Sequence, residues 1–140
     1  MFKGEYNHII DHKKRLSIPS KLRKTLGKKA VVTRGLDNCL VVYPLKEWDK
    51  TAEKLEGLPT GQPEARGFAR IMLSGATDVD LDKLGRILVP DNLRDYAFLE
   101  KNVVVIGLSN KIELWNEKRW NEYKGKMEPT VNKMAENLGI

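Results

Sequence analysis

The sequence of 140 residues contains one structural unit twice. Residues 11–23 align with residues 82–94, and the Asp, Arg, Pro, Leu and Arg of the first segment recur at the same places in the second. After one inserted residue the match resumes, so that residues 31–48 align with residues 103–120. A unit of about seventy residues buries little apolar surface alone, so two such units are expected to interlock around a shared core.

Each unit is predicted to consist mainly of strands with short helices. In the first unit, apolar residues alternate over residues 2–10, a polar turn follows, and a second short strand runs over residues 15–18. Pro19 then opens a short helix, and two β-branched strands over residues 30–34 and 39–43 form a hairpin. A longer helix follows, and the second unit repeats this order. The sequence therefore predicts a mainly β protein with short helices, of the α+β class.

Positive charge is concentrated in the first unit. The chain has a net charge of +6, and residues 11–34 hold nine Lys and Arg side chains against the single acid Asp11. Such clustering is typical of a protein that binds the phosphate backbone of nucleic acids. Charge alone does not distinguish this from a solvated surface that only keeps the protein soluble.

The composition excludes several classes of protein. Hydrophobic residues make up 41% and charged residues 31%, which is the balance of a folded globular protein. The longest apolar runs are far shorter than the ~20 residues that span a bilayer, and the lone Cys39 cannot form an internal disulfide. The N-terminal segment lacks the long apolar core of a secretory signal. We therefore expect an intracellular, cytoplasmic protein rather than a membrane or secreted one.

A D-x-x-x-R element occurs in each unit, from Asp11 to Arg15 and from Asp82 to Arg86. An Asp at the start of a tight turn can accept backbone N–H groups, while the Arg leaves along the next strand. An Arg held in this way can contact a phosphate, or a guanine edge through two hydrogen bonds. In the alternative, Asp and Arg only pair and stabilise the turn. We favour the turn role for both aspartates and DNA contact for Arg15, because two lysines precede it. Arg86 lies in a neutral segment, and both roles stay open for it.

Each D-x-x-x-R element is followed by an aliphatic-x-aliphatic-Pro-x-x-Leu-Arg run, and together they resemble the MraZ family of bacterial transcription regulators. Residues 2–8 (FKGEYNH) and 103–108 (VVVIGL) add to the resemblance, which covers nearly the whole chain, from Phe2 to about Tyr123. Lys14 departs from the family pattern, because the first motif usually has Gly there. Glycine adopts positive φ freely, whereas lysine does not.

The resemblance implies a fold of two SpoVT-AbrB-like domains, in which two internal repeats form a pseudo-dimeric, swapped-hairpin β-barrel with peripheral helices. The domains are expected at residues 5–47 and 76–119, with connecting helices and a linker at 48–75 and a C-terminal helical tail at 120–140. It also implies a ring-shaped homo-oligomer that binds repeated DNA boxes in promoters upstream of the division and cell-wall gene cluster. A regulator of this kind is expected to be associated with the nucleoid.

The resemblance places the DNA-contacting arginine of the first motif on Arg15 and its second-motif equivalent on Arg86. The charge pattern adds further basic residues from the same segment and from the first strand. The first unit is expected to face double-stranded DNA, and the second mainly to complete the barrel. The expected DNA-binding residues are Arg15, Lys13, Lys14, Arg86, Lys21, Arg23 and Lys3, and the expected turn-forming residues are Asp11, Asp82, Pro19 and Pro90.

No complete catalytic or metal-binding set is found in the sequence. His8 and His12 lack the further ligands that a metal site needs, so His8 is interpreted as a packed side chain of the first strand. Cys39 lies in an apolar strand and is interpreted as an inert buried thiol. We therefore expect a protein that is not an enzyme and has no metal, cofactor or small-molecule substrate.

The main alternative is an antitoxin-like protein that neutralises a partner protein, because AbrB-type barrels also occur in antitoxins. Antitoxins of that kind usually carry one such unit and a disordered tail, whereas this chain has two units. RNA binding is disfavoured, because no aromatic residue lies within the basic segment at residues 11–34.

Three tryptophans bear on oligomerisation. Trp48, Trp115 and Trp120 carry large apolar surfaces that either fill the core of one chain or contribute to contacts between subunits. The sequence leaves both interpretations open.

Overall fold

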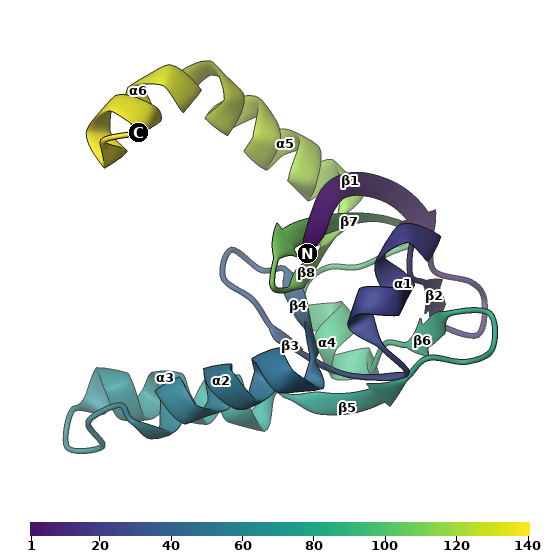
Figure 1. Ribbon diagram of the computed structural model, residues 1–140, viewed down its shortest axis with the longest axis horizontal. Helices are drawn as coiled ribbons and strands as arrows, with labels where there is room; N and C mark the ends of the chain where they lie inside the picture. Colours follow the sequence, from purple (N-terminus) through teal and green to yellow (C-terminus); the bar gives the residue numbers. More distant parts are fainter.

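The computed structural model describes residues 1–140 and has eight strands and six α-helices (Figure 1). The strands are β1 (Phe2–Ile9), β2 (Arg15–Ser17), β3 (Lys29–Arg34), β4 (Leu40–Pro44), β5 (Thr77–Asp80), β6 (Arg86–Leu88), β7 (Asn102–Ser109) and β8 (Ile112–Asn116). The helices are α1 (Ser20–Leu26), α2 (Leu45–Glu56), α3 (Pro63–Ser74), α4 (Asp91–Tyr96), α5 (Glu117–Met127) and α6 (Val131–Leu138), with a 3-10 turn, η1 (Glu128–Thr130), before α6. The α+β class predicted from the sequence is confirmed.

The two units exchange their first strands. The main sheet has six antiparallel strands in the order β1-β7-β8-β4-β3-β5, so β1 of the first unit pairs with β7 of the second. In the same way, β5 of the second unit pairs with β3 of the first. The hairpins β3–β4 and β7–β8 meet in the middle of the sheet, where β4 pairs with β8. Neither unit has a complete sheet of its own, as expected for interlocked repeats.

A pseudo-two-fold axis relates the two units. Where β4 meets β8, Val41 faces Glu113, its own counterpart in the repeat. In the second sheet, a two-stranded ribbon of β2 and β6, Leu16 faces Ile87, which is again its own counterpart. Residues that face their own counterparts lie on a two-fold axis. The chain is therefore an internal pseudo-dimer, although β1 and β5 remain edges and no continuous hydrogen-bonded barrel is closed.

Both sheets cover one apolar core, which anchors the β2–β6 ribbon. Leu16 and Ile87 point inward from the ribbon and are fully buried. Leu22 of α1 and Leu93 of α4 reach the same core from the helices that follow the two ribbon strands. Complete burial of a leucine or isoleucine contributes about 1.5–3 kcal/mol. These residues therefore fix the ribbon against the body and leave its other face directed outward.

Two helical arms extend from the sheets in Figure 1. The first consists of α2 and α3, which pack against each other as a hairpin. The second consists of α5 and α6 and begins at Asn116, whose side chain accepts a hydrogen bond from Arg119 N at 3.0 Å. Lys124 Nζ of α5 lies 3.1 Å from Glu5 Oε1 of β1, which fastens the base of the second arm to the sheet. No helix in the protein combines the length and the apolar character needed to cross a membrane.

The three tryptophans pack within the chain. Trp115 is buried in a small cluster with Cys39, and the ring of Trp120 lies 5.4 Å from that of Trp115. Trp48 packs on Tyr43, with ring centroids 5.7 Å apart. The exposed apolar surface of the arms lies elsewhere, at Phe68, Ile71 and Leu73 of α3 and at Val131 and Leu138 of α6.

Candidate nucleic-acid interface

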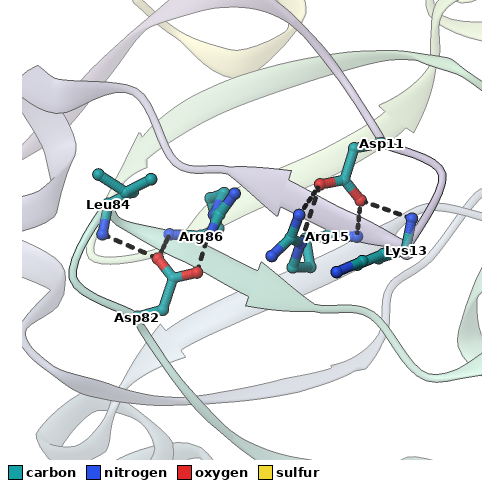
Figure 2. A network of polar contacts seen from close by, with 6 residues as sticks. All are labelled: Asp11, Lys13, Arg15, Asp82, Leu84 and Arg86. Carbon is teal, nitrogen blue, oxygen red and sulfur yellow. Dashed lines mark hydrogen bonds and ion pairs between the residues drawn. The ribbon is translucent and has the colours of Figure 1, made fainter.

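Turn 1, residues 11–14, is organised by one carboxylate (Figure 2). Asp11 Oδ1 accepts hydrogen bonds from Lys13 N and Arg15 N, both at 2.9 Å. Asp11 Oδ2 lies 2.9 Å from Arg15 Nε and 2.8 Å from Arg15 Nη2. The pKa of Asp11 is lowered to about 2, chiefly because the backbone N–H of Arg15 donates to the carboxylate and its guanidinium lies alongside. The carboxylate orients Arg15 through Nε and Nη2 and leaves Nη1 for an external partner.

Turn 2, residues 82–85, repeats this arrangement, except that Arg86 contacts its aspartate through Nε. Asp82 Oδ1 accepts from Leu84 N and Arg86 N at 2.9 Å, and Asp82 Oδ2 accepts from Arg86 Nε at 2.8 Å. The pKa of Asp82 is lowered for the same reason, the hydrogen bond from the backbone N–H of Arg86 coming first. Figure 2 shows the two turns at opposite ends of the β2–β6 ribbon, with Arg15 and Arg86 between them.

Lys14 keeps the turn geometry that glycine has in turn 2. The φ of Lys14 is 65°, and the φ of Gly85, its counterpart in the repeat, is 75°. The departure from the family pattern therefore changes the charge and the strain of turn 1 but not its shape.

The outer face of the ribbon carries both arginines. Leu16 points into the core, so its neighbours Arg15 and Ser17 lie on the opposite face of β2. Arg86 and Leu88 lie on the same face of β6, where Arg15 is opposite Leu88 and Ser17 is opposite Arg86. The side chains of Arg15 and Arg86 are 29% and 24% exposed. Both guanidinium groups therefore reach solvent near the centre of one surface.

Each turn is also held by the other unit. Ile18 N donates to Gly85 O at 2.9 Å, and Val89 N donates to Lys14 O at 3.3 Å. These bonds are equivalent under the pseudo-two-fold axis. The positions of turns 1 and 2 are therefore coupled through the ribbon.

Pro19 and Pro90 end the two ribbon strands and begin the short helices. Each has φ near the value that a helix start requires, −50° for Pro19 and −59° for Pro90. Their carbonyl oxygens accept from Leu22 N at 2.9 Å and from Leu93 N at 3.1 Å. The prolines thus set the direction in which α1 and α4 leave the ribbon.

The side chain of Arg23 is held by contacts within the protein. Its Nε donates to Ile18 O at 2.7 Å, and its side chain lies over Gly85 so closely that a Cβ there would collide with Arg23 Nε. Arg94, the repeat counterpart, donates from Nε to Val89 O at 3.2 Å and also pairs with Asp91. Arg23 therefore supports the end of β2 and covers turn 2, and any contact with DNA stays a prediction.

The predicted lysines are exposed but not all of them lie together. Lys13 and Lys14 lie in turn 1 directly before Arg15, and Lys21 lies on the exposed side of α1. Lys3 lies near the start of β1, roughly 25 Å along the strand from turn 1. The structure therefore groups Lys13 and Lys14 with Arg15 and separates Lys3 from them.

Two equivalent hollows border the turns, and they reveal basic residues that the sequence analysis missed. Beside turn 1, the hollow is lined by Lys14, Arg94 and Lys101 but also by Asp11 and Glu100. Beside turn 2, the lining residues are more basic and include Arg23, Lys24, Lys28 and Lys83, with Asp82 as the acid. Arg94 could have been found as the repeat counterpart of Arg23.

His12 lies in turn 1 and lines the hollow there, whereas His8 and Cys39 lie outside the turns. His8 is half-buried on β1, and its pKa is lowered by burial and by the nearby charge of Arg23. Cys39 is buried, and burial raises the pKa of its thiol. No group of three His, Cys, Asp or Glu side chains is placed to hold a metal ion.

Comparisons with known proteins give one consistent result. A family model described as "MraZ protein, putative antitoxin-like" matches residues 1–71 and again residues 72–139. The chain is 49% identical over 138 residues to the "Transcriptional regulator MraZ" of Natranaerobius thermophilus, covering 99% of this chain and 96% of that protein. It is 52% identical over 143 residues to the protein of the same name from Halothermothrix orenii, covering 100% of both. The corresponding protein of Acetivibrio thermocellus is 46% identical over 140 residues, covering 100% of this chain and 98% of that protein.

Proposed function

Because this chain belongs to the MraZ family, we propose that it is a non-enzymatic transcriptional regulator that binds double-stranded DNA through the outer face of the β2–β6 ribbon. The relatives' name describes a regulator of transcription, and the ribbon offers the chemistry that such a role needs. The proposed contacts to bases come from Arg15 and Arg86. The proposed contacts to phosphates come from Lys13, Lys14, Lys21 and Arg23, with Lys3 as an outlying member.

The observation that carries the proposal is the shared orientation of Arg15 and Arg86. Each guanidinium is held by an aspartate of its own turn and still reaches solvent on the outer face of the ribbon. An arginine that has already given up side-chain freedom loses less entropy when it binds a phosphate or a guanine edge. A two-stranded ribbon also fits the width of the major groove.

The distribution of charge supports a nucleic-acid partner over a neutral one. Lys13 and Lys14 are exposed beside Arg15, and basic side chains line the hollow beside turn 2. Such a surface attracts the phosphate backbone and gives binding that weakens as salt is added. The equivalent geometry of Arg86 extends the proposed surface to the second unit, which the sequence had suggested mainly completes the fold.

The proposal extends to assembly and to the sites on DNA. The two units, proposed as domains at residues 5–47 and 76–119, form one pseudo-dimeric body, with connecting helices at 48–75 and a helical tail at 120–140. Exposed apolar side chains on α3 and α6 support contacts between subunits. On the family resemblance we propose a ring-shaped homo-oligomer, cytoplasmic and associated with the nucleoid, that binds repeated promoter boxes of the division and cell-wall gene cluster.

The description of the family model also supports a second candidate function, neutralisation of a partner protein as an antitoxin. This chain has two complete units sharing one core, and residues 131–138 of its tail are helical. An antitoxin of the expected kind would have one unit and a disordered tail. The structure therefore favours the DNA-binding candidate.

Capture of genomic fragments tests the proposed function. The purified full chain is incubated with sheared genomic DNA at physiological salt, and bound fragments are sequenced. We expect a repeated short box to be enriched by the wild type and not by Arg15→Ala. Enrichment that is equal for both proteins, or no enrichment at all, would contradict the proposal. Light scattering on the purified protein without DNA tests the ring, and a 16.0 kDa monomer would exclude it.

A further inference from the structure

The outer face of the β2–β6 ribbon carries two exposed leucines among its basic residues. Leu88, opposite Arg15 in the strand register, is 60% exposed, and Leu84 in turn 2 is 62% exposed. Their repeat counterparts are Ser17 and Lys13, which are polar. The backbone of the ribbon is therefore symmetric, but only the second unit contributes apolar side chains to this surface.

The stability of the fold does not explain these leucines. An exposed leucine gains little from the hydrophobic effect, which depends on the apolar area removed from water. Ser17 shows that the same backbone position accepts a polar side chain. The neighbours of Leu88 are basic: Arg15 lies opposite it, and Lys14 O accepts the hydrogen bond from the next residue, Val89.

The side chains around Leu88 indicate the chemistry of the partner that would contact it. The basic side chains around Leu88 favour an anionic partner. The exposed leucine among them favours a partner that also presents an apolar group to the outer face of the ribbon. In the major groove, the C5-methyl of thymine is the apolar group that base edges display. A two-stranded ribbon entering that groove would bring Arg15 and Leu88 to neighbouring base edges.

We propose that Leu88, next to Arg15, contacts a thymine methyl group in the bound DNA and so determines sequence specificity beside the arginine contact, with Leu84 at the turn 2 end of the ribbon as a second candidate. This inference rests on the proposed function, since it needs the ribbon to face DNA. It assigns base recognition to apolar side chains of the second unit, in addition to Arg15 and Arg86. It also predicts that the bound box is chemically asymmetric, because Ser17 cannot make the contact that Leu88 makes.

Removal of single methyl groups from the DNA tests the proposal. The probe is a duplex selected by the wild-type protein from a randomised library, in which each thymine is replaced in turn by deoxyuridine. We expect wild-type affinity to fall about fourfold at one or two positions, the factor for one buried group of this size. Leu88→Ser, which installs the residue found at the counterpart position, is expected to bind the thymine and deoxyuridine duplexes equally. Leu84→Ala reports on any second position.

A matched control separates this effect from general loss of apolar surface. Leu36 is 67% exposed in the β3–β4 hairpin, away from β2 and β6 in Figure 1. Leu36→Ser is expected to keep the full sensitivity to deoxyuridine, and thermal unfolding should show both serine variants folded.

Each other outcome overturns the inference in a recognisable way. If the wild type selects no duplex, the proposed function fails and the inference with it. If the wild type binds a selected duplex but Leu88→Ser retains the same sensitivity to deoxyuridine, or the wild type has none, only the inference fails. If Leu88→Ser changes the mass in light scattering and leaves that sensitivity unchanged, the leucine contacts a second copy of the chain instead of DNA.

Discussion

Lys14 and Gly85 occupy the same place in turns 1 and 2, and both have left-handed backbone, with φ of 65° and 75°. The carbonyl of each accepts a hydrogen bond from the other unit, so neither turn can relax without moving the other. Positive φ strains a lysine but not a glycine. Turn 1 therefore holds strain that turn 2 lacks, at the residue next to Arg15.

Replacing Lys14 by glycine should raise the stability of the fold and weaken DNA binding. Relief of the left-handed strain is worth about 1–2 kcal/mol, and the greater freedom of glycine in the unfolded chain offsets about 0.5–1 kcal/mol of it. We therefore expect the free energy of unfolding of Lys14→Gly to rise by up to about 1.5 kcal/mol in a urea titration. Loss of stability in Lys14→Gly would show that its backbone is not strained.

The reverse change in turn 2 provides the control. A Cβ added at Gly85 meets the side chain of Arg23 and also has to adopt φ of 75°. We expect Gly85→Ala to destabilise the protein by about 1–3 kcal/mol in the same titration. Effects of opposite sign at the two turns would follow directly from their shared geometry.

Acid should weaken the fold through the two turn aspartates. Hydrogen bonds and the adjacent guanidinium lower the pKa of Asp11 from 3.8 to about 2, and that of Asp82 is lowered in the same way. The carboxylate is therefore favoured in the folded state, so its stabilising effect is complete above the unfolded pKa and is lost as pH falls through the folded pKa. We expect urea midpoints to fall from about pH 4 to pH 2, and to fall less in Asp11→Asn. Identical pH profiles for the two proteins would mean that turn 1 does not stabilise the ionised carboxylate.

Arg23 should behave as a support of the ribbon rather than only as a charge. Arg23→Ala removes the bond from Nε to Ile18 O and the stem that covers Gly85, and should cost about 1–3 kcal/mol. Arg23→Lys keeps the charge but has no Nε donor, so we expect it to remain destabilised in thermal unfolding. If lysine restored both stability and DNA affinity, Arg23 would act through its charge alone.

Salt should weaken DNA binding steeply, and individual lysines should account for part of the slope. Lys28 lines the basic hollow beside turn 2, and Lys24 lies next to it there. We expect Lys28→Ala or Lys24→Ala to weaken binding to all duplexes alike. Each substitution should also reduce the slope of log K against log salt by about 1, because one phosphate is no longer neutralised. Lys133→Ala, on the exposed surface of α6, serves as the control and should leave the slope unchanged.

The layout of each unit could be predicted because its signals are local. Alternating apolar residues indicated β1, and Pro19 indicated the start of α1. The pairing of β2 with β6 could not be predicted from pattern, because three residues carry no usable periodicity. That pairing depends on how Leu16 and Ile87 meet in the core, which is a property of the whole fold.

In the candidate site, too, the local contacts could be predicted from the sequence and the contacts between distant segments could not. An Asp four residues before an Arg can be expected to form such a turn from local chemistry, and the hydrogen bonds at Asp11 are of that kind. Arg23 donates to Ile18 O and contacts Gly85, and these contacts join segments that are separate in the sequence. The charge pattern alone therefore predicted only a DNA contact for Arg23 and not its structural role. The charge pattern did not predict Lys83, because this residue lies in the half of the chain without excess positive charge. In the structure it lines the basic hollow beside turn 2.

The titration of one selected duplex with wild type and with Arg15→Ala tests the DNA-binding face most directly. Both proteins are measured at physiological salt against the selected duplex and against a scrambled duplex of equal length, with Lys133→Ala as the control. We predict that Arg15→Ala loses the preference for the selected duplex and keeps only weak binding common to both, while Lys133→Ala matches the wild type. An Arg15→Ala protein that is folded and retains the wild-type preference would contradict the assignment of the β2–β6 ribbon as the DNA-binding surface.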